Sequence, residues 1–433
     1  MSANIKVSGK TYNGIETVSV KNTDNDLVDF LLQGVTPPTK NYGFDYVTFI
    51  DYDGSIVISY SKEEFLALSA MPANPSHTGL ASEGWNWTLS DAKTYVTNNG
   101  ELIIGQMYAT ASGKTEYDVE INEATGFIAT LNNNAEKDWG DGTIDNSTTH
   151  TYSAAGSYTI KLGGTSLPNV MSSKKLRAVR IAGGVTLIDT YTFQGCRALT
   201  EITIPSSVVE FYSVSDCRAL KCVVLPSGVL YTSNSAFGQC YSLQYISLPN
   251  SIGSLPLFNS CLSLQRISIP SSITVIFGNT FTNCAALQSV TIPSSVVSIG
   301  GSAFHSCNAL LSIRIPNSIT EIGDMIFNSC YSLQSVSIAE GVEEIGNSSF
   351  AMCSALQEVT IPSSVTNIHS NAFNYSDWLK VVIILALTPP TLEEDNAFPS
   401  SVEKIYIPHG TLSAYQSATN WSTYSSLFVE LHA

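Results

Sequence analysis

The chain has 433 residues, and at about 150 residues per domain this length suggests about three domains. Acidic residues outnumber basic ones by 36 to 20, which gives a formal net charge of -16. An acidic surface repels phosphate groups, so we expect neither nucleic acid nor an anionic membrane as a partner. The hydrophobic fraction of 44% excludes a disordered chain.

No targeting or membrane-spanning segment is predicted. The opening residues MSANIKVSGK contain no apolar run after a basic start, so we expect no secretory signal peptide. The apolar stretch Val381–Leu387 is far shorter than the roughly 20 residues that a membrane helix needs. These features predict a soluble chain.

Residues 1–40 form the first expected unit, a β segment. NIKVSGKTYNG, which begins at Asn4, predicts a hairpin, and KNTDNDL predicts a turn. Ile5–Gln33 resembles the short N-terminal segments of phage structural proteins, and this resemblance implies a role in attachment to a virion.

Residues 41–104 form the second expected unit. Val47–Leu89 alternates apolar and polar residues, turns at Asp53-Gly54, and runs through proline-containing loops to Trp85 and Trp87. This pattern is similar to the internalin-type B repeat of bacterial surface proteins, which implies a β-grasp module.

Residues 105–168 form the third expected unit. It contains the motifs Trp139-Gly140-Asp141-Gly142, His150-Thr151-Tyr152 and Gly156-Ser157-Tyr158-Thr159-Ile160. Glycines permit a tight turn and tyrosines fill the space between two sheets. Together these motifs resemble a β-sandwich of the polycystic-kidney-disease (PKD) type.

Aspartates in two of these turns raise the question of calcium. Neither Asp51–Gly54 nor Asp138–Gly142 is an EF-hand loop with its terminal glutamate. We therefore predict that these aspartates bond to their own backbone. The six histidines show no spacing typical of metal ligands, so no metal site is predicted.

The remaining chain is a repeat, marked by cysteines at intervals of 21 or 23 residues. The consensus is C-x-x-L-x-x-I-x-I-P-x-S-I-x-x-I-G-x-x-A-F-x-x. Three columns follow this period: Cys196, Cys217, Cys240, Cys261, Cys284, Cys307, Cys330 and Cys353; Leu176, Leu199, Leu220, Leu243, Leu264, Leu287, Leu310, Leu333, Leu356 and Leu379, then Val402; and Phe193, Phe237, Phe258, Phe281, Phe304, Phe327, Phe350 and Phe373.

This period predicts a solenoid with one short strand per turn, because the I-x-I alternation is closed by a proline that cannot donate to a ladder. We expect a mainly β protein with about eleven stacked strands, a sheet roughly 50 Å long, preceded by the small β units. Stacked cysteines lie about 4.8 Å apart, too far for disulfides, so we expect reduced structural thiols. Disulfide pairing and metal or redox roles are the alternatives.

The repeats, over Leu176–Ile407, resemble the BspA-like leucine-rich repeats of bacterial surface proteins. We place them at residues 169–404, followed by a cap at residues 405–433. The segment Ile405–Phe428 resembles the closing segment of that family, with a last strand and a short helix around Leu412–Ala418.

Residues two and four after each column leucine should point out of the sheet. Tyrosine and arginine are effective anchors at interfaces, so this face is a candidate for ligand binding, with a merely solvated sheet as the alternative. Cys222 lies outside the cysteine column and could be exposed. Val381 and Ile383 should be covered by the tail or by a partner. The candidate binding residues are Tyr245, Arg266, Arg314, Glu201, Val224 and Glu358, and the cluster Lys174, Lys175, Arg177 and Arg180 is interpreted as a solvated edge.

No catalytic signature is present, neither G-x-S-x-G nor a Walker loop or dinucleotide fingerprint, so we predict neither an enzyme nor a cofactor. The favoured function is non-catalytic recognition or adhesion outside the cell, through a glycan or protein on a host or neighbouring cell. The protein would belong either to a phage virion, as a tail or capsid-associated protein, or to a bacterial surface, with a virion or cell-wall partner bound through the N-terminal region. A structural spacer without a specific ligand is the alternative, and two carboxylates about 5 to 9 Å apart in a cleft would indicate a glycan hydrolase.

Overall fold

The computed structural model describes residues 5–7, 10–12, 46–122, 126–127, 131 and 135–431. Strands β1 (Ile5–Val7) and β2 (Lys10–Tyr12) pair in antiparallel fashion, which confirms the expected N-terminal hairpin. The rest of the phage-like segment Ile5–Gln33 lies outside the described residues, and so does its predicted turn.

Residues 46–110 form a compact unit that we call the N-terminal module. Its mixed sheet has the order β4-β3-β6-β5, with β3 and β6 parallel at the centre and helices α1 and α2 packed on it. Ser61 caps α1 through a capping box with Glu64, and Thr88 caps α2. The elements are β3 (Tyr46–Ile50), β4 (Ile56–Ser61), α1 (Lys62–Ala67), β5 (Leu80–Trp85), α2 (Leu89–Asn99) and β6 (Leu102–Thr110).

The next unit continues the sheet of the solenoid. We expected it to begin at residue 105, but β6 runs on to Thr110, so it begins after that residue. Its strand β7 pairs in antiparallel fashion with β13, the first strand of the repeats, and so covers the edge at which the solenoid begins. The strands are β7 (Thr115–Ile121), β8 (Gly126–Phe127), β9 (Lys137–Asp138), β10 (Ile144–Asp145), β11 (Thr151–Tyr152) and β12 (Gly156–Leu162).

The motif residues of this unit form its core. Trp139 and Tyr152 are fully buried, and the Tyr152 hydroxyl donates to the Trp139 carbonyl oxygen at 2.9 Å. The His150 ring stacks on Trp139 with 4.9 Å between the ring centroids. The sequence motifs therefore mark the packing centre, while the assignment to the PKD type stays a prediction, as does that of the N-terminal module to the internalin type.

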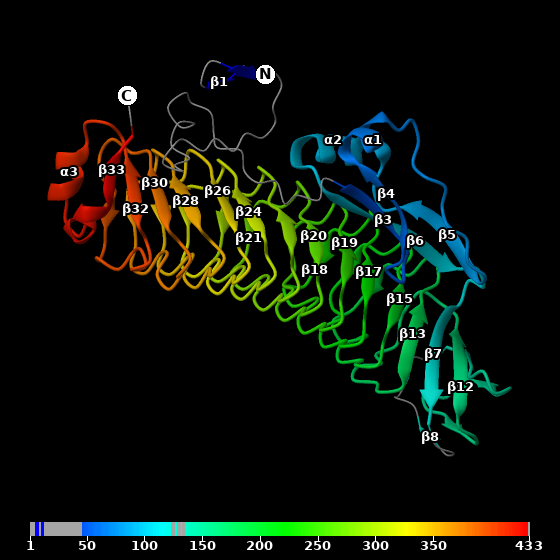
Figure 1. The fold of residues 1–433 in the computed structure, drawn as a ribbon. Helices are drawn as coiled ribbons and strands as arrows, with labels where there is room; N and C mark the ends of the chain where they lie inside the picture. Colours follow the sequence, from blue (N-terminus) through cyan, green and yellow to red (C-terminus); the bar gives the residue numbers. More distant parts are fainter. Residues whose placement is uncertain are drawn as a thin grey trace.

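The repeats form a long solenoid in which every turn adds one strand to a parallel row (Figure 1). Neighbouring strands pair 23 residues apart along most of the row, as in Arg266 with Ser289. Eleven strands make up the expected row: β13 (Leu176–Arg180), β15 (Glu201–Thr203), β17 (Cys222–Val224), β19 (Tyr245–Ser247), β20 (Arg266–Ser268), β22 (Ser289–Thr291), β24 (Ser312–Ile315), β26 (Ser335–Ile338), β28 (Glu358–Ile361), β30 (Val381–Ile384) and β32 (Lys404–Ile407).

A second row of two-residue strands runs along another side of the solenoid. Many of its apolar members, such as Ile276 and Ile299, point into the core. The strands are β14 (Leu187–Ile188), β16 (Glu210–Phe211), β18 (Tyr231–Thr232), β21 (Val275–Ile276), β23 (Ser298–Ile299), β25 (Glu321–Ile322), β27 (Glu344–Ile345), β29 (Asn367–Ile368) and β31 (Thr391–Leu392).

The phenylalanine column forms a continuous stack in the core. From Phe237 to Phe398 the neighbouring rings are nearly parallel, with centroids 5.1 to 5.5 Å apart. Val214 holds the column position in one turn, and there Phe211 from β16 stacks on Phe237 instead, at 5.5 Å. A phenylalanine from a neighbouring column thus fills the gap that the sequence showed.

The cysteine column consists of buried free thiols. Each column thiol donates to a backbone carbonyl of the preceding turn, as Cys284 does to Phe258 at 3.2 Å, and Ser376 continues the pattern in the turn after Cys353. Burial raises the pKa of the thiols of Cys196, Cys240, Cys284 and Cys330 to about 12. The expectation of reduced structural thiols agrees with this arrangement.

The C-terminal end closes the solenoid, as expected, with a helix at α3 (Leu412–Ser417). We expected the strand before this helix, β32, to be the last one, but the chain continues through a 3-10 helix η2 (Ser422–Leu427) into β33 (Phe428–Glu430), which pairs in parallel with β32. Trp421 is fully buried beside Phe398, 6.0 Å between ring centroids, and covers the end of the phenylalanine stack.

Candidate functional site

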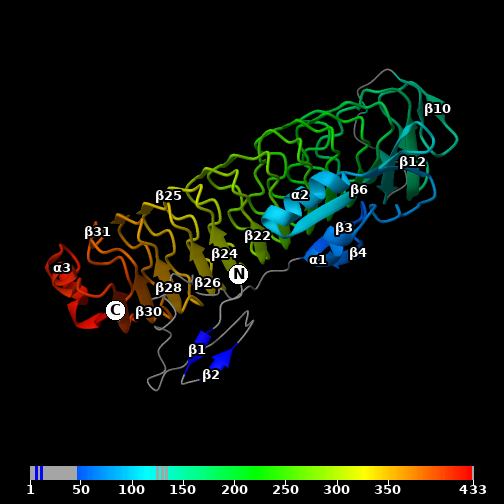
Figure 2. The same ribbon diagram turned by 90° about the horizontal axis from the view of Figure 1, so that it is seen from above.

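The candidate site is the outward face of the long parallel sheet, which the N-terminal module divides into two parts. The module lies across β15, β17, β19 and β20, beside the first half of the solenoid (Figures 1 and 2). We call β15 to β22 the covered turns and β24 to β28 the distal turns. The six candidate residues fall in both parts.

An apolar cluster joins the module to the covered turns. Ile50, Ile103 and Met107 of the module pack against Cys222 and Val224, with Tyr245 partly buried at the cluster edge. Val224 is only 5% exposed, and Cys222 is buried, with its thiol donating to the Asp51 carbonyl oxygen at 3.6 Å. The expectation that Cys222 and Val224 lie on an accessible face is therefore wrong, because the module covers them.

Gly105 allows β6 to approach the solenoid this closely. A Cβ atom at this position would lie 2.5 Å from both methyl groups of Val224 and 3.0 Å from the Cβ of Ser247. Residues Ile103, Gly105 and Met107 face the solenoid, while Leu102 and Ile104 face the core of the module. Strand β6 is therefore buried on both faces.

Arg266 also contacts the module. Its guanidinium Nη1 lies 3.8 Å from the carboxylate of Glu101, whose side chain is 6% exposed. The same carboxylate accepts a hydrogen bond from the Ser289 hydroxyl at 2.8 Å, and the Glu101 carbonyl oxygen accepts one from Ser268. Arg266 and the neighbouring hydroxyls thus hold Glu101 in place.

Glu201 lies half-buried at the first covered strand. The pKa of the Tyr52 phenol, which belongs to the module, is raised mainly by burial and secondly by the negative charge of Glu201. Four of the six candidates, Glu201, Val224, Tyr245 and Arg266, therefore lie in the covered turns.

Arg314 and Glu358 lie in the distal turns. Arg314 is exposed on β24, and Glu358 is half-buried on β28, where burial raises the pKa of its carboxyl. Hydroxyl groups surround them on the same face, at Ser312, Ser335, Ser337 and Thr360. This surface combines a cation, a carboxyl group and a row of hydroxyls.

The last turns are covered by the C-terminal tail. Ile383 and Tyr406 are each 3% exposed, and Leu431 after β33 packs with them. Val381 is partly buried in the same cluster. The expectation that the tail or a partner covers Val381 and Ile383 is confirmed, and the covering chain is the tail.

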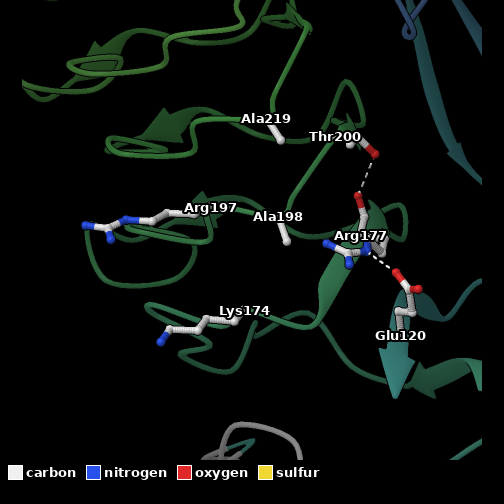
Figure 3. A pocket seen from close by; sticks show the side chains of 7 residues that line it. All are labelled: Glu120, Lys174, Arg177, Arg197, Ala198, Thr200 and Ala219. Carbon is white, nitrogen blue, oxygen red and sulfur yellow. Dashed lines mark hydrogen bonds and ion pairs between the residues drawn. The ribbon is translucent and has the colours of Figure 1, made fainter. Parts of the chain in front are cut away.

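The two arginines of the basic cluster at the start of the repeats form ion pairs. Arg177 Nε lies 2.6 Å from a carboxylate oxygen of Glu120, and Arg180 pairs with Glu116 and Asp118. These ion pairs join β13 to β7. For the two arginines, the interpretation of the cluster as a merely solvated edge is therefore wrong. Figure 3 shows a pocket lined by Arg177 and Glu120, in which Lys174 and Arg197 point away from the Arg177–Glu120 pair.

The turn aspartates bond to their own backbone as predicted. Asp53 accepts from the Ser55 N–H, Asp138 from the Gly140 N–H and Asp141 from the Thr143 N–H. Within the described residues, no group of three or more His, Cys, Asp or Glu side chains could hold a metal ion. In that same part of the chain, no helix has the length and apolar character needed to span a bilayer.

The sequence patterns did not predict which residues of the module contact the solenoid. Asn86 is 2% exposed, and its amide nitrogen donates to the Leu225 carbonyl oxygen and to the Ser247 hydroxyl, both at 2.9 Å. The available signal was the nearly continuous apolar run of β6, because a strand buried on both faces loses the alternation of a half-exposed one.

The stacked parallel strands and their apolar columns define a leucine-rich repeat solenoid. Residues 168–256 and 254–380 match, in six copies, the family described as the BspA type leucine rich repeat region. The repeats of residues 168–380 are therefore of the BspA type.

Several solved structures are similar to the chain. A leucine-rich repeat protein from Bacteroides ovatus is 22% identical, with a TM-score of 0.37, over 64% of this chain and 89% of that one. A leucine rich cell surface protein from Faecalibacterium prausnitzii is 28% identical, with a TM-score of 0.30, over 50% and 74%. The T. pallidum leucine-rich repeat protein is 29% identical, with a TM-score of 0.32, over 41% and 74%. No curated protein sequence matches the chain.

Proposed function

We propose that this is a non-catalytic recognition or adhesion protein that binds its ligand through the distal turns of the sheet. The observation that carries the proposal is the exposed guanidinium of Arg314 on a face lined by hydroxyl groups, beyond the part that the module covers. A guanidinium group with five donors suits the carboxylates and hydroxyls of glycans and proteins.

The proposed setting is extracellular. The BspA-type family of the repeats favours a bacterial cell surface, whereas the resemblance of Ile5–Gln33 to phage structural proteins favours a virion that contacts a host. In both settings the N-terminal region would attach the protein, to a virion or to the cell wall, and the solenoid would present the binding surface to a glycan or protein of another cell.

Binding of the full chain to whole bacterial cells, a glycan panel and a matrix-protein panel tests the proposal. We expect saturable binding. The affinity should fall roughly tenfold or more in R314A/E358Q, because a buried, well-paired interface residue contributes about 2 kcal/mol or more to the free energy of binding. Y231A is the matched control, since Tyr231 is 60% exposed on the second row of strands and away from the sheet face.

Two results would contradict the proposal. If R314A/E358Q and Y231A lose binding affinity equally, the ligand does not bind at the distal turns. A folded chain that binds none of the cells, glycans or matrix proteins would favour the structural spacer instead.

A further inference from the structure

The proline of the repeat has an effect on the sheet that reaches beyond its own turn. In a parallel ladder, the carbonyl oxygen at the end of one strand accepts from the N–H that follows the partner strand. Proline has no N–H, so a turn with proline at this position leaves the carbonyl of the preceding turn without its ladder donor.

Turns that lack this proline confirm the rule. Ala339, Leu385 and Leu431 stand where the consensus has proline. Each donates its backbone N–H to the carbonyl oxygen of the preceding turn: Ala339 to Ile315 at 3.3 Å, Leu385 to Ile361 at 3.0 Å and Leu431 to Ile407 at 2.8 Å. The ladder is complete in these turns.

In the first half of the solenoid, the N-terminal module supplies most of the missing donors. Pro249, Pro270 and Pro293 remove the ladder donors for Leu225, Leu248 and Ile269. Those three carbonyl oxygens accept instead from the Asn86 amide at 2.9 Å, the Trp87 indole N–H at 2.9 Å and the Tyr95 hydroxyl at 2.8 Å. The same holds for Pro205, since the Ile181 carbonyl accepts from the backbone N–H of Thr110 at 3.2 Å.

We infer that the proline column is a docking signal for the N-terminal module. Consecutive prolines present a row of carbonyl oxygens without ladder donors, one per turn. The module carries donors for four of the five carbonyls from Ile181 to Ile269, the exception being Ile204, which precedes Pro205 and loses its ladder donor to Pro226. Buried carbonyls need a partner, so the module is held where the row is unbroken. Ala339 and Leu385 interrupt the row farther along, which excludes the same docking over the distal turns and leaves those turns to a ligand.

Three of the four donors come from one continuous part of the module, and the fourth is the N–H of Thr110 at the end of β6. Asn86 and Trp87 follow β5, and Tyr95 lies on α2. The Tyr95 ring packs in the core cluster of the module, and its hydroxyl contacts the solenoid. The side-chain oxygen Oδ1 of Asn86 also accepts from the Gly105 N–H at 2.9 Å, which fixes the direction of the side-chain amide nitrogen. The donor row is therefore preorganised before it meets the solenoid.

Alkylation of Cys222 in the folded full chain measures docking directly. Cys222 lies under the module, whereas the other eight cysteines lie in the core column. The variant P249A/P270A/P293A restores the ladder donors, which compete for the three carbonyls. We expect iodoacetamide to modify Cys222 roughly tenfold faster or more in this variant, as located by mass spectrometry, while the column thiols stay protected.

The matched control is P362A, which makes the same change between turns that the module does not contact. We expect its Cys222 alkylation rate to equal that of the unmodified chain. A second variant, W87F/Y95F, removes two donors from the module side and should also accelerate alkylation, whereas W85F should not, because the Trp85 indole donates to Pro72 inside the module. An unchanged rate in both P249A/P270A/P293A and W87F/Y95F, or equal acceleration in P362A, would overturn the inference.

Discussion

The solenoid should unfold when the pH rises from 8 to 9.5. Its eight column thiols are buried, and burial raises their pKa well above the ordinary value of about 8.5, to about 12 for Cys240 and Cys284. A raised folded-state pKa gives stability that is complete below the unfolded-state pKa and is lost as the pH rises toward the folded-state pKa. At one pH unit above 8.5, each thiol lowers the free energy of unfolding by about 1.4 kcal/mol. For the whole column the loss is on the order of 10 kcal/mol, which is as much as the entire stability of a domain.

Circular dichroism and thiolate absorbance near 240 nm, recorded together, test this expectation. Both signals should change in the same pH interval, because thiols ionise only as turns open. Phenols and ammonium groups ionise near pH 10 or above when unfolded, so an effect that is complete by about pH 9.5 belongs to the thiols. Full thiolate absorbance at pH 9.5 with an unchanged dichroism spectrum would show that the column is accessible, and the account of it would fail.

Truncation of one phenylalanine in the stack should have the largest effect of any single substitution in the solenoid. Phe281 is fully buried between Phe258 and Phe304, with ring centroids 5.5 and 5.1 Å away. F281A removes a stacked ring and leaves a cavity that the neighbouring turns cannot fill, so we expect a loss of about 3 to 5 kcal/mol. Because each turn is stabilised by its neighbours, the loss should weaken the turns on both sides.

F277A is the matched control, since Phe277 lies four residues earlier in the same turn and is 44% exposed. Its expected effect on the free energy of unfolding is within about 0.5 kcal/mol. Urea denaturation followed by circular dichroism compares the two variants. Equal midpoints for F281A and F277A would mean that the stack does not stabilise the solenoid.

The columns of the repeat made the solenoid predictable. Cysteine, leucine and phenylalanine recur at a constant spacing because each turn must place the same side chain over the last one, and this constraint is visible in the sequence itself. Val214 stands where the column has phenylalanine, so the sequence showed that one ring is missing from the stack. The ring that takes its place is Phe211, which belongs to another column. Compensation of that kind depends on the geometry between turns, which no single column records.

The covered half of the sheet face could not be predicted from alternation. The pattern correctly gave the outward direction of Val224, Tyr245 and Arg266, but direction does not tell whether a residue meets solvent or another part of the chain. The contact of Asn86 with Leu225 joins residues far apart in sequence, and it depends on a carbonyl left unpaired by Pro249. Arg314 and Glu358 remain as candidates because the module does not reach them.

The two halves of the face thus have different roles. The first half holds the protein's own module through apolar packing at Cys222 and Val224 and through side-chain donors to the backbone. The second half presents Arg314 among hydroxyls. The proposed recognition function rests on that division of the face.

Oxidation of methionines by dilute hydrogen peroxide tests this division most directly. Met107 lies between the module and the solenoid and is 4% exposed, whereas Met325 and Met352 on the solenoid are 45% and 40% exposed. In the native full chain, we expect peptide mapping to show rapid oxidation of Met325 and Met352 and little at Met107. Oxidation of Met107 at the same rate as Met325 would show that the module does not cover the sheet, and the division of the face would be wrong.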